Sequence, residues 1–161
     1  MTSRRRHESL VPLSREHHYG LMLCLRIHRG LGQYDNDEAW VRERADQATQ
    51  FFATDLVPHF KAEEEALFPA MREFAGAPEL LNRLLAEHRK LEALADRLRG
   101  ADVAELLDAL REFSDLLEAH IRTEERELFP LYERLAGDDV AAKVSLAVRD
   151  IIGEAMRPRS Q

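Results

Sequence analysis

The feature that most constrains the fold of this chain is an internal repeat. Segments 59–69 (HFKAEEEALFP) and 120–130 (HIRTEERELFP) share six of eleven residues: one His, two Glu, one Leu, one Phe and one Pro. The similarity extends to a second pair of segments, because Leu13-Ser-Arg-Glu-His17 aligns with Leu84-Leu-Ala-Glu-His88. A segment that recurs together with its neighbour indicates that a supersecondary unit has been duplicated. We therefore predict two copies of one helical hairpin.

Apolar residues along the chain recur with the period of an α-helix, and almost none alternate with the period of two that a β-strand needs. The pattern predicts helices at 14–31, 38–74, 79–99, 102–136 and 137–156. Pro58 and Pro69 lie inside the second of these, and each removes a backbone donor, so we expect a kink or a break there. The predicted fold class is all-α, an up-down four-helix bundle over residues 13–136.

Both ends of the chain flank this bundle. We expect residues 1–12 and 157–161 to be flexible tails, with His7 disordered. The short helix at 137–156 carries one apolar stripe, which should pack on the bundle or on a second subunit. The stripe consists of Val140, Val144, Ala147, Val148 and Ile151.

The charge and cysteine content restrict the partners and the compartment. The chain has 161 residues, enough for one domain, and its net charge of −7 does not favour nucleic acid or an anionic membrane as the main partner. The run Arg4 to Arg6 is more typical of a solvated tail. With Cys24 alone, no intrachain disulfide can form, and its place on the inward face suggests a small packed hydrophobe. Because nothing in this cysteine content implies an oxidising compartment, we expect a cytoplasmic protein. No apolar run is long enough for a membrane span, so we expect it to be soluble.

Metal chemistry is indicated by two histidine–glutamate pairs inside the repeat. His59 and Glu63, like His120 and Glu124, are four residues apart and therefore stack on one helical face. Imidazole suits iron, copper and zinc, and a carboxylate can bridge two cations. Two such pairs on facing helices, with one further histidine from each remaining helix, could hold a dinuclear centre.

Two questions about these residues stay open at this point. The histidines could instead be core residues paired with glutamates, although buried ion pairs are costly to desolvate. On the first helix, His17 shares a face with Leu21 and Cys24, whereas His18 falls near Arg29. We favour His17 as the ligand, and keep His18 as a possible ligand that is better placed as a rim residue or a dimer contact.

Several neighbouring residues are given other roles. Glu92, four residues after His88, is a possible further ligand. His28 lies too far along its helix from His17 and should be packed or hydrogen-bonded. Three glutamates, Glu64, Glu87 and Glu125, are adjacent to ligands and point about 100° away from them. We predict that they form a solvated face, and keep as the alternative that they orient the imidazoles. Leu67-Phe68 and Leu128-Phe129 should wall off the core.

At these residues the chain resembles the hemerythrin-like HHE cation-binding family, whose pattern of H, H-x-x-x-E, H and H-x-x-x-E covers about residues 13–131. The resemblance implies two iron ions in a di-iron centre with carboxylate and oxo or hydroxo bridges. It assigns Glu63 and Glu124 as bridging carboxylates. It assigns as terminal ligands His17, His59, His88 and His120.

The chain departs from the oxygen-carrying members of that family. They have a further histidine at the position of Glu92, and an aspartate five residues after the last histidine where this chain has Glu124 at four. Fewer imidazoles and more carboxylate favour the ferric state, so the departures argue against reversible oxygen carriage. Ferritin-like proteins use Glu-x-x-His instead, which does not supply the inward pairs here.

The leading functional hypothesis is a non-haem di-iron protein that binds or senses O2, NO or peroxide, with weak catalase- or peroxidase-like turnover. One alternative is an enzyme that consumes peroxide or NO, with Glu92 as a nearby acid. Another is an iron-responsive interaction protein that uses the last helix and the His18 face. The His18 face also suggests a homodimer.

Overall fold

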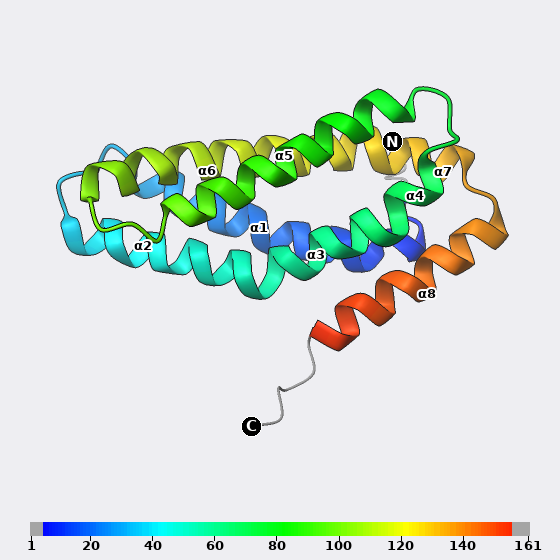
Figure 1. The fold of residues 1–161 in the computed structure, drawn as a ribbon, viewed down its shortest axis with the longest axis horizontal. Coiled ribbons are helices and arrows are strands. Elements are labelled where there is room, and N and C mark those ends of the chain that lie inside the picture. The colour runs from blue at the N-terminus through cyan, green and yellow to red at the C-terminus, as the bar shows by residue number, and fades with distance from the viewer. Residues whose placement is uncertain (1–4, 156–161) are drawn as a thin grey trace.

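A computed structural model describes residues 5–155 of the chain as four helical arms side by side, with a further helix packed obliquely across them (Figure 1). The first arm is α1 and the third is α5. The second arm is α2, α3 and α4, and the fourth is α6 and α7. Their bounds, with those of the oblique helix α8, are α1 (Val11–Gly30), α2 (Glu38–Phe51), α3 (Val57–Ala62), α4 (Phe68–Met71), α5 (Ala77–Arg97), α6 (Val103–Thr123), α7 (Phe129–Leu135) and α8 (Asp138–Ala155). The described residues contain no strand, and the predicted all-α bundle is confirmed.

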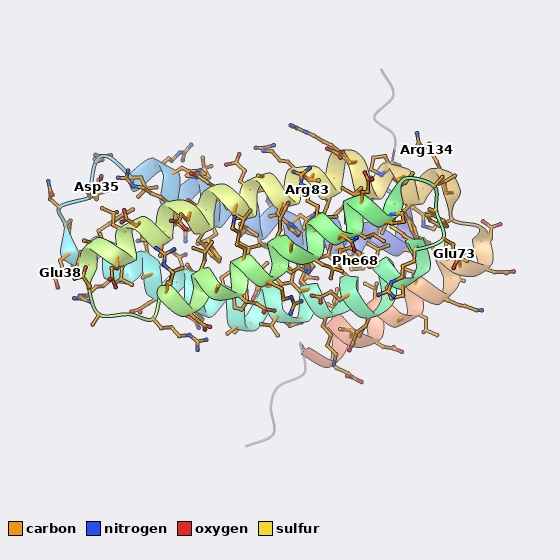
Figure 2. The ribbon with its side chains drawn as sticks, turned by 45° about the horizontal axis from the view of Figure 1, so that its top comes forward. Asp35, Glu38, Phe68, Glu73, Arg83 and Arg134 are labelled. Carbon is orange, nitrogen blue, oxygen red and sulfur yellow. The ribbon has the colours of Figure 1, made fainter. Side chains whose placement is uncertain are left out.

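The arms reverse direction at turns that the sequence marks clearly. Asp37 accepts a hydrogen bond from the backbone N–H of Trp40 at 3.0 Å, and Asp102 accepts one from Glu105 at 3.1 Å. Each aspartate satisfies a donor that has no partner inside its helix. Gly76 precedes α5 with φ of 81°, a backbone conformation that favours glycine. These turns place Asp35 and Glu38 at one end of the bundle and Glu73 and Arg134 at the other (Figure 2).

The prolines of the second and fourth arms are accommodated by π-helical turns, so of the predicted kink or break the break does not occur. The turns Phe52–Leu56, Glu63–Leu67 and Glu124–Leu128 each end two residues before a proline. In each turn the next backbone N–H reaches the carbonyl five residues back, as from Phe68 to Glu63. Because the ring of a proline crowds the carbonyl four residues back, a wider turn relieves the contact while the helix continues.

The apolar core is divided in two by a band of buried polar residues. One cluster, near the turn between α1 and α2, includes Ile27, Val41, Leu91 and Phe113. The second cluster, near α8, is separate and includes the following buried side chains: Leu13, Phe68, Met71, Leu84, Phe129 and Val148. On α1 and on α5 a buried histidine lies between members of the two clusters, so the polar band occupies the middle of the bundle.

Helix α8 packs on the bundle rather than standing free. Val144 and Val148 are buried against the apolar cluster at that end. The predicted stripe needs one correction, because Val140 is 36% exposed and Ala141 is buried in its place. One residue along a helix turns a side chain by about 100°, so a small rotation of α8 exchanges these neighbours.

The N-terminal segment contradicts the prediction of a flexible tail over 1–12 in its described part. A 3-10 turn spans Glu8–Leu10, with His7 capping it through Nδ1, and α1 begins at Val11 instead of Ser14. Leu10 is fully buried, and Arg6 forms ion pairs with the last arm. Burial of one apolar side chain and pairing of one arginine therefore dock this segment. Residues 1–4, with Arg4, and the predicted tail at 157–161 lie outside the described residues.

Within the described part of the chain, each helix is too short or too polar to cross a membrane.

Candidate metal centre

The six residues predicted as metal ligands lie together in the polar band at the middle of the bundle. Each arm contributes one histidine, and the two glutamates are the first residues of π turns on the second and fourth arms. No side chain of the six is more than 4% exposed. They are His17, His59, Glu63, His88, His120 and Glu124.

The two optional ligands lie elsewhere. His18 is exposed, because it is one residue beyond His17 and therefore turned away from the interior. Glu92 is 42% exposed and pairs with Arg89 at 2.8 Å. The structure thus favours His17 over His18, and it places Glu92 outside the buried group.

The first half of the centre joins α1 to the second arm. Nε2 of His17 lies 2.9 Å from Oε2 of Glu124, and Nε2 of His59 lies 3.2 Å from Oε1 of Glu63. The two Nε2 atoms are 3.1 Å apart. One potential ligand atom from each of these four residues lies within 4.8 Å of the others, which is compact enough to surround one cation.

The second half joins α5 to the fourth arm and uses the same two glutamates. Nε2 of His88 lies 3.3 Å from Oε1 of Glu63, and Nε2 of His120 lies 3.1 Å from Oε1 of Glu124. These four residues again form a group within 4.8 Å. The two groups therefore share both carboxylates, which is the arrangement that bridging of two cations requires.

The outer nitrogen of each histidine faces a different glutamate. Nδ1 of His17 lies 2.7 Å from Glu125, and Nδ1 of His88 lies 2.9 Å from Glu64. The other two outer contacts, each longer, are His59 to Glu16 at 3.6 Å and His120 to Glu87 at 3.5 Å. A carboxylate at Nδ1 holds the proton there and directs Nε2 toward the centre.

This outer ring of carboxylates corrects the sequence interpretation. Glu64, Glu87 and Glu125 were predicted to form a solvated face, yet their side chains are 26%, 13% and 27% exposed and contact the imidazoles. No role was predicted for Glu16. A helical wheel describes one helix, whereas each of these glutamates reaches the histidine of a neighbouring arm. The repeat contained a usable signal, because Glu16 and Glu87 occupy equivalent positions.

Two of the outer carboxylates are held by arginine. Glu125 accepts from Arg6 at 2.6 Å and from the hydroxyl of Ser14 at 2.7 Å. Glu64 pairs with Arg89. The docked N-terminal segment therefore connects, through Arg6 and Glu125, to the outer nitrogen of His17.

The pKa values of the buried groups are governed by these pairings. Burial lowers the pKa of His120, but the carboxylates that face it, Glu124 above all, together outweigh burial and raise that pKa to about 10. Burial also lowers the pKa of His59, but Glu63 and Glu16 together outweigh burial and raise that pKa well above its ordinary value. Burial raises the pKa of Glu124, but the facing His120 and His17 bring it well below its usual range. Without a cation, the centre is thus held by imidazolium–carboxylate pairs.

The donors at the centre fit a metal better than they fit each other. Both oxygens of Glu63 and of Glu124 are buried without a hydrogen-bond partner, as are Nε2 of His88 and of His120. They lie in ion-pair range but are not aligned for hydrogen bonds. Buried polar atoms left without partners are costly, and imidazole nitrogen with carboxylate oxygen is a donor set that suits iron and zinc.

Comparison with known proteins agrees with this geometry. The family model "Hemerythrin HHE cation binding domain" matches residues 10–151. The chain belongs to this family. No solved structure matches the chain. A DNA nickase from Nostoc sp. (strain PCC 7120 / SAG 25.82 / UTEX 2576) is 30% identical over 99 residues, which is 60% of this chain and 27% of that protein. The chain thus spans about a quarter of the length of that curated relative.

The HHE centre has a small cavity against three of its four histidines. A space of about 10 Å³ lies beside His17, His59 and His120, which is about what one water molecule occupies on this measure. Gly20 lines it, and a Cβ there would meet Cδ1 of Ile121 at 2.8 Å. In the repeat, the position of Gly20 corresponds to Leu91, which is fully buried.

Aromatic rings enclose the imidazoles of the HHE centre. Phe60 stacks on His88 with ring centroids 3.8 Å apart, and Phe68 lies on the same imidazole at 5.7 Å. Phe129 stacks on His17 at 5.4 Å. The expected apolar walls at Phe68 and Phe129 therefore contact the histidines directly. They exclude water from the imidazoles, which strengthens the charge interactions inside.

The remaining polar candidates play structural roles in the HHE fold. His28 contacts Asp115 at 2.9 Å on the surface, as a hydrogen-bonded histidine should. Cys24 is buried, and burial raises the pKa of its thiol to about 12. A thiol that stays protonated is a poor nucleophile or ligand, so Cys24 packs as a small hydrophobe.

Proposed function

We propose that this HHE protein holds two iron ions and binds or senses a small ligand, O2, NO or peroxide, beside one of them. His17 and His59 would hold one ion, and His88 and His120 the other. Glu63 and Glu124 would bridge the two. The observation that carries the proposal is the pair of overlapping four-residue groups that share both glutamates, with a cavity lined by both histidines of the first group and by His120 of the second.

The residues around the iron pair would each have a defined task. The outer carboxylates face Nδ1 of each histidine, closely at His17 and His88 and at longer range at His59 and His120. They would favour a proton on Nδ1 and so leave Nε2 free to bind metal. The phenylalanines exclude bulk water. Iron bound there would supply an open coordination position and electrons for exchange with the ligand.

The size of the cavity restricts the ligand. A space of about 10 Å³ admits a molecule of one to a few atoms and no organic substrate. Gly20 makes this space possible because it has no side chain. The support for a diatomic or peroxide ligand is therefore steric as well as chemical.

Glu92 bears on two of the alternatives. It stands where oxygen carriers have a histidine, and its side chain faces solvent in an ion pair with Arg89. The centre consequently has four imidazoles, which favours sensing or peroxide chemistry over reversible oxygen carriage. An enzyme would need an acid near the ligand, and Glu16 and Asp55 line the cavity whereas Glu92 does not.

Metal analysis and rapid mixing test the proposal. Protein loaded with ferrous iron in the absence of oxygen should contain about two irons per chain, from the two groups of ligands. Mixing with O2, NO and peroxide should give a ligand-dependent absorption change. A single tightly bound zinc per chain, or no spectral response to any of the three molecules, would refute it. Continued peroxide consumption would favour the enzyme alternative.

The DNA nickase relative suggests a competing function that we do not adopt. The match covers 27% of that protein, and this chain has a net charge of −7, which repels DNA. We expect the iron-loaded protein to leave supercoiled plasmid intact at moderate salt. Appearance of the open-circular form, abolished by Glu63→Ala, would favour DNA cleavage instead.

A further inference from the structure

Two hollows of different size meet at the His17 side of the centre. The inner one is the cavity of about 10 Å³ described above. The outer one is a surface groove of about 290 Å³ between α1, the second arm and the C-terminal end of α8. Glu16 and Asp55 line both hollows. These two carboxylates therefore stand between the surface groove and the metal ligands.

Among the described residues, neither carboxylate at the passage forms a salt bridge with an arginine or a lysine. Oε1 of Glu16 is buried without a hydrogen-bond partner, 3.6 Å from Nδ1 of His59. Asp55 is half-buried and accepts a hydrogen bond from the hydroxyl of Thr54 at 2.7 Å. Arg15 lines the outer groove, but among the described residues no salt bridge joins it to either carboxylate.

The second half of the centre lacks this arrangement at the equivalent positions. Glu87 corresponds to Glu16, but Leu116 stands where Asp55 stands in the first half. The cavity-lining Gly20 is replaced by the buried Leu91. The duplication kept the carboxylate that orients the imidazole, and only the first half adds a second carboxylate at an opening.

We propose that Glu16 and Asp55 form a charge filter at the mouth of the metal centre, which draws cations in and repels anions while neutral molecules pass. The part that concerns small ligands rests on the proposed function, and the part that concerns cations does not. Two negative charges beside a narrow, apolar-walled passage focus the field on whatever enters. The physiological ligand would therefore be neutral, as O2, NO and hydrogen peroxide are, and metal would load by the same route.

Cation entry can be measured on the metal-free full-length protein with Co²⁺ as a coloured probe. Asp55→Asn removes one of the two charges at the mouth, and we expect Co²⁺ uptake at low salt to slow by about threefold to tenfold, within the range of electrostatic steering. High salt should remove the difference, because exposed charges are then screened. Asp55→Lys should slow uptake further.

The matched control is Asp108→Asn. Asp108 is exposed on α6, twelve residues from His120, or about 18 Å along the helix. It changes the net charge equally without touching the groove, so it should leave Co²⁺ uptake near the wild-type rate. Equal slowing by both variants would overturn the filter, since the effect would then belong to net charge alone.

Ligand entry is measured on the iron-loaded protein with azide as an anion and NO as a neutral molecule. Asp55→Asn should speed azide association by about threefold or more at low salt and leave NO association unchanged, because only the anion feels the removed charge. An equal change for both would mean that the substitution altered the passage sterically, and would refute the filter.

The two experiments separate the filter from the proposed function. If Asp55→Asn slows Co²⁺ uptake and the iron-loaded protein responds to no small molecule, the filter stands for cations and the proposed ligand function falls. If Co²⁺ uptake and the azide-to-NO ratio match those of Asp108→Asn, the filter falls even where small ligands bind.

Discussion

The two halves of the metal centre use the same donors but surround them differently. Each half has one histidine from a single-helix arm, one histidine from a proline-containing arm and the same pair of glutamates. Around the second half, Phe60 stacks on His88 and Leu91 fills the space beside it. Around the first half, the equivalent positions hold Ile121 and Gly20, and a cavity remains.

This difference shows which part of a duplicated unit is free to change. The ligands and their outer carboxylates are held in place by charge, since loss of one partner leaves another buried charge unpaired. The apolar lining is restricted only by volume, and volume can be redistributed between neighbours at modest cost. Divergence of the lining therefore leaves space beside Gly20 and fills the equivalent space with the side chain of Leu91.

Removing the two shared glutamates should abolish metal binding in both halves of the centre. The double variant Glu63→Ala and Glu124→Ala takes away both bridges, so metal content should fall from about two ions per chain to less than one. The measurement is metal analysis after gel filtration, with circular dichroism to verify helicity. His18→Ala is the control and should retain both ions. Full metal content in the double variant would disprove the ligand assignment.

Truncating Leu91, which occupies the position equivalent to Gly20, should lower the stability of the protein. Leu91 is fully buried against the bundle core, and truncation in Leu91→Ala should cost about 2–5 kcal/mol of unfolding free energy. Urea denaturation of the metal-free protein measures this. A loss below about 1 kcal/mol would show that the second half repacks easily. The two halves would then not differ in how tightly their linings are packed.

Adding a side chain at Gly20 should weaken ligand binding without removing metal. The methyl group of Gly20→Ala would meet Ile121 at 2.8 Å and occupy part of the cavity. We expect affinity for NO to fall about tenfold, or roughly 1.4 kcal/mol, while two irons remain bound. Spectroscopic titration with NO provides the test, and an unchanged affinity would place the ligand elsewhere.

Alkaline pH should destabilise both halves when metal is absent. The pKa of His120 is raised to about 10, so its ion pair contributes fully below about 6.5, the pKa of unfolded histidine, and is lost as pH rises through 10. The melting temperature of metal-free protein should therefore fall by roughly 5–10 °C between pH 8 and 10.5.

The metal-loaded protein is the control for this pH dependence. Its histidines are neutral ligands that keep only the Nδ1 proton and have no imidazolium proton to lose in this range, so its melting temperature should change less. At the acid end, the lowered pKa of Glu124 predicts that its contribution is lost as pH falls through that pKa. Equal alkaline losses with and without metal would contradict the pairing scheme.

The smallest expected effect comes from the outer arginines. Arg6→Gln releases Glu125, which orients His17, and should speed loss of metal to a chelator by about twofold to fivefold, less than the effect of removing a direct partner of a ligand. Arg89 is 54% exposed, so Arg89→Gln should have less effect still. A larger effect of Arg89→Gln than of Arg6→Gln would contradict this ranking of the two arginines.

The sequence was informative where a pattern repeats within one helix. The spacing of four in His59/Glu63 and His120/Glu124, together with the duplication, predicted six residues that the structure brings together. It did not predict the outer ring, since Glu16, Glu64, Glu87 and Glu125 act on histidines of other arms. It also misjudged Arg6, whose partners lie more than a hundred residues away in the chain, and Leu10, which is buried in the apolar cluster near α8.

By itself the sequence determined the helices, the duplication and the residues that face inward, because helical period and i, i+4 spacing are local properties. Only the tertiary structure decided that four histidines meet around two shared glutamates, that Pro58, Pro69 and Pro130 follow π turns, and that a cavity lies beside Gly20. These features depend on distances between arms. Such distances follow from how side chains such as Gly20, Leu91 and Phe60 fill the space between helices, and that packing has no period that one helix could display.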